Sequence, residues 1–170
     1  MGGMLSDILL ALLVLGAGAF FAYRASPVAQ AVLFGSAMLA SGLLFLPGEQ
    51  ITGLVGAEGI GWLRRWAAHT PFDISQWTHF LIFAWLGLLL WLGRVDLRGW
   101  KAWAMVAVLA IAAELAQGLA PGRAPRLDDV VTNLVGGVTG LLLGSALGVL
   151  LASMLQRLRP RLGKQSDAER

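Results

Sequence analysis

The sequence predicts an all-α protein, a polytopic integral membrane helical bundle with about five transmembrane helices and a short interfacial helix between the second and third. Three observations support this fold class. Hydrophobic residues make up 57% of the 170 residues and charged residues only 14%, a balance that is unusual for a soluble domain. The apolar residues form runs of about 20, the length that crosses a bilayer. Many of the 22 glycines lie inside these runs, as they do in membrane helices.

The composition also excludes several classes of protein. The net charge is +3, but no basic stripe is interleaved with exposed aromatic residues, so we expect no nucleic-acid partner. The chain has no cysteine, which rules out disulfides and thiolate metal sites. We therefore expect a single membrane domain over residues 1–170, with membrane lipid as its surroundings.

The first apolar run covers residues 4–23. A cleaved signal peptide is the alternative interpretation, but the N-terminal region contains Asp7 and has no Lys or Arg. We therefore expect a retained, additional N-terminal transmembrane helix in residues 1–24. The second helix is expected at residues 28–46, where Pro47-Gly48 ends the apolar run.

The stretch between the second and third helices, residues 49–75, is the longest polar-leaning part of the chain. Within it, Trp62 and Trp66 stand four residues apart, and apolar residues alternate with Arg64 and Arg65. This pattern is typical of a short amphipathic helix lying in the membrane interface. We interpret the stretch as surface structure with aromatic anchors, and a lid over the polar site is the alternative.

The third, fourth and fifth helices are expected at residues 76–93, 101–120 and 129–155, followed by a basic tail at 156–170. With five spans, nine of the 13 Lys and Arg residues lie on the side of that tail and four on the other side. The positive-inside rule then places the tail in the cytoplasm and the N-terminus outside. The turn at Pro121-Gly122 faces outward in this topology.

Six polar or ionisable residues gather near the predicted outer ends of the third, fourth and fifth helices. Such groups are expensive to bury in an apolar bundle and need partners. Helical spacing puts Glu114 and Gln117 on one face of the fourth helix, and Asp129 and Asn133 on one face of the fifth. The candidate site residues are His79, Glu114, Gln117, Arg123, Asp129 and Asn133.

Helix capping or snorkelling to the headgroups explains the presence of Glu114 less well than that of the other polar residues. Glu114 lies about two turns before Pro121, below the headgroups, where a carboxylate must pair with a cation or stay protonated. Arg123 and His79 are the available partners, and Asp129 approaches the same place, so we expect Arg123 to lie between two carboxylates. A purely structural buried network is the alternative.

Glycines repeat every four residues along the predicted fifth helix. Such a ridge allows two helix backbones to approach closely. The ridge either packs against a helix of the same chain or forms a homo-oligomer interface, and the sequence does not separate these alternatives. Its members are Gly136, Gly140, Gly144 and Gly148.

Together these residues resemble the VanZ-like family of membrane proteins. The family usually has an Asp four residues before the His, followed by Lys, whereas this chain has Ser75 and Gln76 there, with Asp73 two residues earlier. The resemblance runs from about the second helix to the fifth, which gives a family core at residues 28–155 and leaves the first helix outside. The matching pattern is His79-Phe80, Glu114-x-x-Gln117, Pro121-x-Arg123 and Asp129-x-x-x-Asn133-x-x-Gly136-x-x-x-Gly140.

The resemblance implies a multi-pass protein of the bacterial inner (cytoplasmic) membrane and a link to glycopeptide (teicoplanin) resistance. It implies no particular reaction. Our first interpretation is an outer-leaflet site for a lipid headgroup or a cell-wall-linked ligand, such as a lipid-linked cell-wall precursor. There Arg123 and Arg126 would hold a phosphate or carboxylate, and Gln117 and Asn133 would orient it. The alternative is an intramembrane enzyme acting on a lipid-linked envelope substrate, with Glu114 or His79 as acid or base.

Other chemistries have less support in the sequence. No G-x-S-x-G motif occurs, and Ser75 has no assigned base. Although His79, Glu114 and Asp129 carry ligand atoms, neither H-E-x-x-H nor a pair of His is present, so we expect no metal and no cofactor. Five spans without an internal repeat argue against a transporter.

Overall fold

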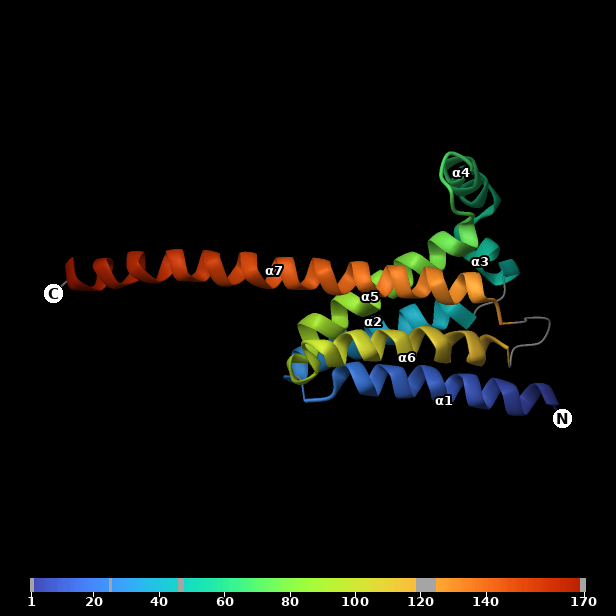
Figure 1. Cartoon of the computed structure of the whole chain (residues 1–170), viewed down its shortest axis with the longest axis horizontal. Helices are drawn as coiled ribbons and strands as arrows, with labels where there is room; N and C mark the ends of the chain where they lie inside the picture. The colour runs from blue at the N-terminus through green and yellow to red at the C-terminus, as the bar shows by residue number, and fades with distance from the viewer. Residues whose placement is uncertain (1, 25, 46–47, 119–124, 169–170) are drawn as a thin grey trace.

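The computed structural model describes residues 2–24, 26–45, 48–118 and 125–168, and within these ranges it contains helices and no strands. Two short helices, α3 (Gly48–Val55) and α4 (Ala57–Ala67), and the 3-10 turn η1 (Val95–Leu97) connect longer helices. The start of α1 and the end of α7 lie at opposite ends of the bundle (Figure 1). The long helices, which run in alternating directions, are α1 (Gly2–Ala22), α2 (Pro27–Phe45), α5 (Ile74–Gly93), α6 (Trp100–Gln117) and α7 (Leu127–Ala168).

Length and composition identify membrane spans in four of these helices, at Pro27–Leu44, Ile74–Gly93, Trp100–Gln117 and Leu127–Arg157. In α1 the apolar stretch is Ile8–Ala22, and this helix packs along α2 as a further antiparallel member of the bundle. Large apolar side chains remain exposed on the outside of the bundle, where lipid can surround them. The prediction of an all-α, multi-pass membrane bundle is confirmed.

The apolar core lies where α2, α5, α6 and α7 meet. Phe83 and Leu90 of α5 are its most completely buried large side chains from that helix, and they pack with residues that the neighbouring helices contribute. Ala37 of α2, Val106 of α6 and Leu141 of α7 are each at most 2% exposed, as are the two residues of α5. This core fixes the relative positions of α5, α6 and α7, which carry the polar site.

α7 packs closely on α5 because glycines occupy the contact. A Cβ at Gly140 would collide with the backbone carbonyl oxygen of Ala84. A Cβ at Gly148, the last glycine of the ridge, would make only ordinary van der Waals contact. Over most of its length, the ridge is therefore covered by a helix of the same chain. The glycines in the tight part of the contact are Gly136, Gly140 and Gly144.

Arg94, at the end of α5, ties the end of α1 to the loop before α6. Its buried guanidinium donates a hydrogen bond to the backbone oxygen of Phe20 (2.7 Å) and binds both carboxylate oxygens of Asp96 (2.9 and 2.8 Å). The guanidinium also lies over the rings of Phe20 and Tyr23. These hydrogen bonds from Arg94 hold the pKa of the Asp96 carboxyl below its usual range.

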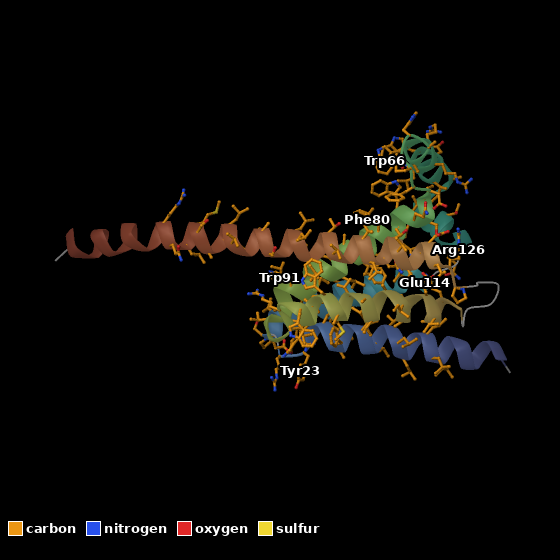
Figure 2. All side chains as sticks on the ribbon, viewed as in Figure 1. Tyr23, Trp66, Phe80, Trp91, Glu114 and Arg126 are labelled. Atoms are coloured by element: carbon orange, nitrogen blue, oxygen red, sulfur yellow. The ribbon has the colours of Figure 1, made fainter. Side chains whose placement is uncertain are left out.

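The stretch that we expected to hold one interfacial helix forms two, α3 and α4. α4 lies across the bundle axis, beside the start of α5, as an interfacial helix would (Figure 1). Trp66 of α4 contacts Trp77 of α5 with ring centroids 5.0 Å apart, and Trp77 donates a hydrogen bond to Thr70 (2.8 Å). Trp62 and Trp66 remain largely exposed. Figure 2 shows Trp66 and Glu114 on opposite sides of α5, which argues against α4 as a lid over the site.

α7 continues well past residue 155, where we expected the fifth helix to end. Its 42 residues correspond to about 63 Å at ~1.5 Å per residue, roughly twice the thickness of the hydrocarbon layer. The predicted basic tail is thus a continuation of α7 as far as Ala168, and it projects beyond the other helices (Figure 1).

Candidate functional site

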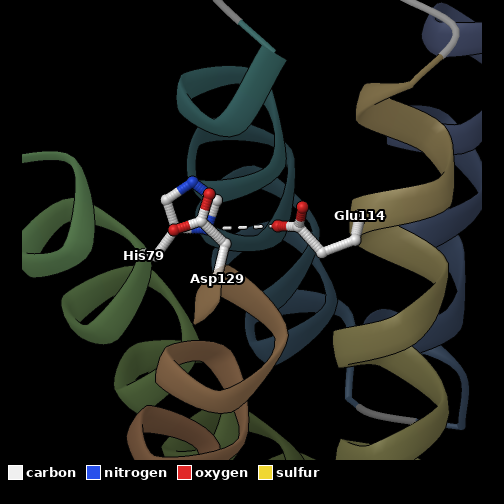
Figure 3. A group of neighbouring side chains, drawn as sticks. All are labelled: His79, Glu114 and Asp129. Carbon is white, nitrogen blue, oxygen red and sulfur yellow. Dashed lines mark ion pairs between the residues drawn. The ribbon is translucent and has the colours of Figure 1, made fainter. Parts of the chain in front are cut away.

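The site lies at one end of the bundle, where α5 and α7 begin and α6 ends. His79 is in the second turn of α5, Glu114 in the last turn of α6 and Asp129 in the first turn of α7. Their side chains point toward one another from the three helices (Figure 3). All three are buried, with 5%, 2% and 6% of their surface exposed, respectively. The structure therefore brings together three residues that the sequence places in separate segments.

His79, Asn133 and Glu114 form a hydrogen-bonded chain. Nδ1 of His79 lies 2.9 Å from Oδ1 of Asn133, and Nδ2 of Asn133 donates to Oε1 of Glu114 over 3.4 Å. Because an amide oxygen only accepts, this orientation of Asn133 places a proton on Nδ1 of His79. The same Nδ1 lies 3.7 Å from Oε1 of Glu114. Asn133 is completely buried and holds the imidazole and the carboxylate in fixed positions.

The second carboxylate oxygen of Glu114 joins α6 to α7. Its Oε2 accepts a hydrogen bond from the backbone N–H of Arg126 (3.1 Å), just before α7 begins. The Arg126 side chain is 58% exposed, and its nearest acidic partner is Asp128, at 3.8 Å. Arg126 therefore contributes its backbone to the buried site and leaves its guanidinium at the rim.

Asp129 differs from Glu114 in its hydrogen bonding. Its Oδ1 is buried and has no hydrogen-bond partner among the described residues, although ligand atoms of His79 and Glu114 lie within 4.8 Å. In the part of the chain that the structure describes, no Lys or Arg side chain forms an ion pair with either carboxylate. Two carboxylates thus share the site with one imidazole.

Gln117 and Arg123 complete the predicted set. Gln117 is buried, but its Nε2 donates to the backbone oxygen of Leu44 (2.9 Å), so this side chain ties α6 to the end of α2. Arg123 lies outside the described residues. Thr132 is a buried polar residue beside the site that the sequence did not single out, and its hydroxyl donates to the backbone oxygen of Asp128 (2.8 Å).

The start of α5 gives a structural role to the residues that depart from the family pattern. Asp73 caps the helix: its Oδ1 accepts from the backbone N–H of Gln76 (2.8 Å), and Gln76 accepts in return from the backbone N–H of Asp73 (3.0 Å). This capping box fixes where α5 begins and thereby the turn on which His79 lies. The Asp73 carboxylate is exposed and does not take part in the buried cluster.

Comparison with known proteins agrees with the pattern of these residues. No curated protein and no solved structure matches the chain. A family model with the description VanZ/LLP1 matches residues 8–155. The match begins inside α1, so it includes most of the first helix, which the resemblance had left outside, as well as every residue of the polar site. Since the match covers most of its length, this multi-pass membrane protein belongs to the VanZ/LLP1 family.

Proposed function

We propose that the protein is a bacterial envelope protein of the cytoplasmic membrane whose polar site binds a lipid headgroup or a cell-wall-linked ligand at the outer leaflet. The observation that carries this proposal is the convergence of His79, Glu114 and Asp129 within 4.8 Å at one end of a membrane bundle. Ionisable groups buried at membrane depth are costly and are found mainly where they bind or transfer something. The site lies near one end of the bundle, which is the end of a membrane protein closest to the membrane surface.

The charges of the cluster indicate what it would bind. Carboxylates accept hydrogen bonds, so the cluster suits the hydroxyl or amino groups of a sugar, peptide or lipid headgroup. Gln117 and Asn133 are already hydrogen-bonded within the protein, so they are not available to orient an anion. The exposed guanidinium of Arg126 at the rim, whose contact with the exposed Asp128 is 3.8 Å long, is placed to hold a phosphate. A headgroup with both a phosphate and hydroxyl or amino groups fits this arrangement.

The outward orientation of the site follows from charge. In the predicted topology nine of the 13 Lys and Arg residues belong to the side opposite the site, and the extension of α7 past residue 155 carries four of these nine. The positive-inside rule places that side in the cytoplasm. The polar site then faces outward, the side from which a glycopeptide reaches the cell wall, as a role in teicoplanin resistance requires.

A second candidate is an intramembrane enzyme acting on a lipid-linked envelope substrate. The hydrogen-bonded chain from His79 through Asn133 to Glu114 favours it, because a fixed imidazole beside a carboxylate is a suitable acid–base pair. With Nδ1 held by Asn133, Nε2 of His79 would exchange the proton. Release of product from a polyprenyl-phosphate-linked substrate by the parent, and not by Glu114→Gln, would establish this candidate. Binding without turnover would support the first proposal.

Glu114→Gln and His79→Ala test whether the site is functional. We expect parent protein, expressed in a teicoplanin-susceptible bacterium, to raise the inhibitory concentration, and both variants to lose this effect while still reaching the membrane. The matched controls, Glu58→Gln and His69→Ala, change exposed residues of the same types and should keep the effect. A stable Glu114→Gln protein with full effect would contradict the proposal. An unstable one would indicate a structural network, because breaking a buried pair costs about 3–5 kcal/mol.

A further inference from the structure

We propose that His79, Glu114 and Asp129 form a binding site for one divalent metal ion of the zinc type. Each residue offers one ligand atom, and these atoms all lie within 4.8 Å of one another. They come from three helices, so no local zinc motif links them in the sequence. Figure 3 shows the three side chains directed into the same small volume.

The charge of the cluster favours a cation. Glu114 and Asp129 are both buried, and the only ion pair that the structure describes for either of them joins Glu114 to His79. Two carboxylates and a neutral imidazole together carry two negative charges in a region with little water. One divalent ion neutralises both charges, and it does so while accepting all three groups as ligands.

Asp129 provides a second and independent observation. Buried carboxylate oxygens nearly always accept a hydrogen bond, yet in the described part of the chain Oδ1 of Asp129 has no partner, although the residue is only 6% exposed. Figure 3 shows this carboxylate beside the His79 ring and facing Glu114. An oxygen that is buried, unpartnered and directed at two other ligand groups is placed to bind an ion.

The remaining contacts resemble those that support metal ligands. Asn133 bonds both His79 and Glu114, and the backbone N–H of Arg126 bonds the other oxygen of Glu114. Such outer contacts orient ligating groups and fix the imidazole tautomer. Asn133 is therefore a positioning residue for the site, and replacing it should weaken metal affinity roughly 10–100-fold.

The ligand types favour zinc over magnesium or calcium. Zinc binds imidazole and carboxylate at about 2.0–2.2 Å, which places tetrahedral ligand atoms about 3.3 Å apart. One ligand atom of each of the three residues lies within 4.8 Å of the others, and side-chain rotation can bring them to that spacing. Magnesium and calcium prefer six or more oxygen ligands. Three protein ligands leave a fourth zinc position open, where a phosphate or carboxylate oxygen of an incoming ligand can bind.

The test is metal binding by the full-length protein in detergent micelles, after removal of any histidine tag and treatment with a chelator. Elemental analysis after equilibration with Zn²⁺ and removal of free ion should give about one equivalent per chain. Zn²⁺ should raise the melting temperature of the parent, and Mg²⁺ should not. Co²⁺ in place of Zn²⁺ should give visible absorption bands of a low-coordinate site with nitrogen and oxygen ligands.

Asp129→Asn is the decisive variant, because it removes no hydrogen bond of Oδ1 and the protein should fold. It should lower zinc affinity at least tenfold, as should Glu114→Gln, whereas Asp128→Asn one residue away should retain the parent affinity. The Asp128 side chain is exposed and outside the cluster. A folded parent that retains no zinc, or an Asp129→Asn protein that binds zinc as tightly as the parent, would overturn the inference.

These results are independent of the proposed function. A protein that binds zinc but has no effect on glycopeptide susceptibility contradicts only the proposed function. A protein that is fully active after chelation and takes up no zinc contradicts only the metal site.

Discussion

Replacing Gly140 by Ala should destabilise the protein, although alanine is the better helix former. A Cβ at this position would collide with the carbonyl oxygen of Ala84 and would lie 2.8 Å from the backbone nitrogen of Leu88. Because these are backbone atoms, no rotamer change relieves the contact and α5 and α7 must separate. Overpacking of this kind costs about 1–3 kcal/mol, and here we expect the upper end. Alanine returns about 1 kcal/mol of helix propensity.

The net loss is therefore about 2 kcal/mol, which in a chain of this size lowers the melting temperature by about 4–8 °C. Leucine at Gly140 or Gly144 should destabilise the protein further, since its side chain cannot fit between the helices. Thermal unfolding of the detergent-solubilised protein, followed by tryptophan fluorescence, measures the change. The test compares the melting temperatures of variants of one protein, so only the differences between them matter.

Two control variants separate packing from helix propensity. Gly42→Ala on α2 has no atom within 4 Å of the new Cβ, so it should keep the propensity gain of about 1 kcal/mol. Gly148→Ala lies on the same ridge as Gly140, but its Cβ would be 3.7 Å from Nε1 of Trp91 and should be tolerated. If Gly140→Ala melts at or above Gly148→Ala, the ridge does not pack on α5 and the reasoning is wrong.

Two further predictions concern orientation and acid stability. A C-terminal GFP fusion should fluoresce and a C-terminal alkaline phosphatase fusion should be inactive, because the positive-inside rule predicts that the basic end of α7 lies in the cytoplasm; the opposite pattern would turn the polar site inward. Arg94 lowers the pKa of Asp96, so the pair stabilises the folded protein at pH values above the usual carboxyl pKa of about 3.9. This stabilisation disappears as the pH falls through the lower pKa that Asp96 has in the folded protein. Asp96→Asn should therefore melt below the parent at neutral pH and approach it in acid, and a pH-independent difference would contradict this.

The helices could be predicted because the bilayer leaves the backbone little choice. Apolar runs of about 20 residues must satisfy their own hydrogen bonds in lipid, so their number and alternating direction follow from the sequence. The division into α3 and α4 could not be predicted. It depends on Gly56 adopting a φ of 79°, and several other glycines in that stretch could adopt such a φ equally well. The end of α7 was also missed, since helix formation beyond the membrane does not require apolar residues.

The site residues could be identified, but not their partners. Helical spacing correctly groups residues by face, and burial of polar groups in an apolar chain marks them as important. Which acceptor each amide reaches depends on helix crossing angles, so Gln117 bonds the backbone of α2 whereas Asn133 joins His79 to Glu114. The role of Arg94 could not be predicted from the sequence, because its burial depends on how α1 packs against the loop.

The charge of the cluster links stability to function. Two carboxylates no more than 4.8 Å apart repel each other by about 3.5 kcal/mol or more at an effective dielectric constant of about 20. That is a large fraction of the roughly 5–15 kcal/mol by which proteins are stable. Glu114 accepts hydrogen bonds from Asn133 and from the Arg126 backbone, whereas Oδ1 of Asp129 accepts none from the residues that the structure describes. Asp129 must therefore be compensated by a cation or a proton.

Asp129→Asn distinguishes these two forms of compensation. In the metal-free protein the variant should melt above the parent, because it removes one of two repelling charges. The favourable interaction of the Asp129 charge with the helix dipole is lost as well, but it contributes only about 0.3–1 kcal/mol. If a metal ion is the natural compensator, zinc should raise the melting temperature of the parent to that of the Asp129→Asn variant or beyond, and it should leave the variant unchanged. If a proton compensates instead, zinc should change neither. A variant that melts below the parent without metal would point to a cationic partner for Asp129, the position that the sequence predicted for Arg123.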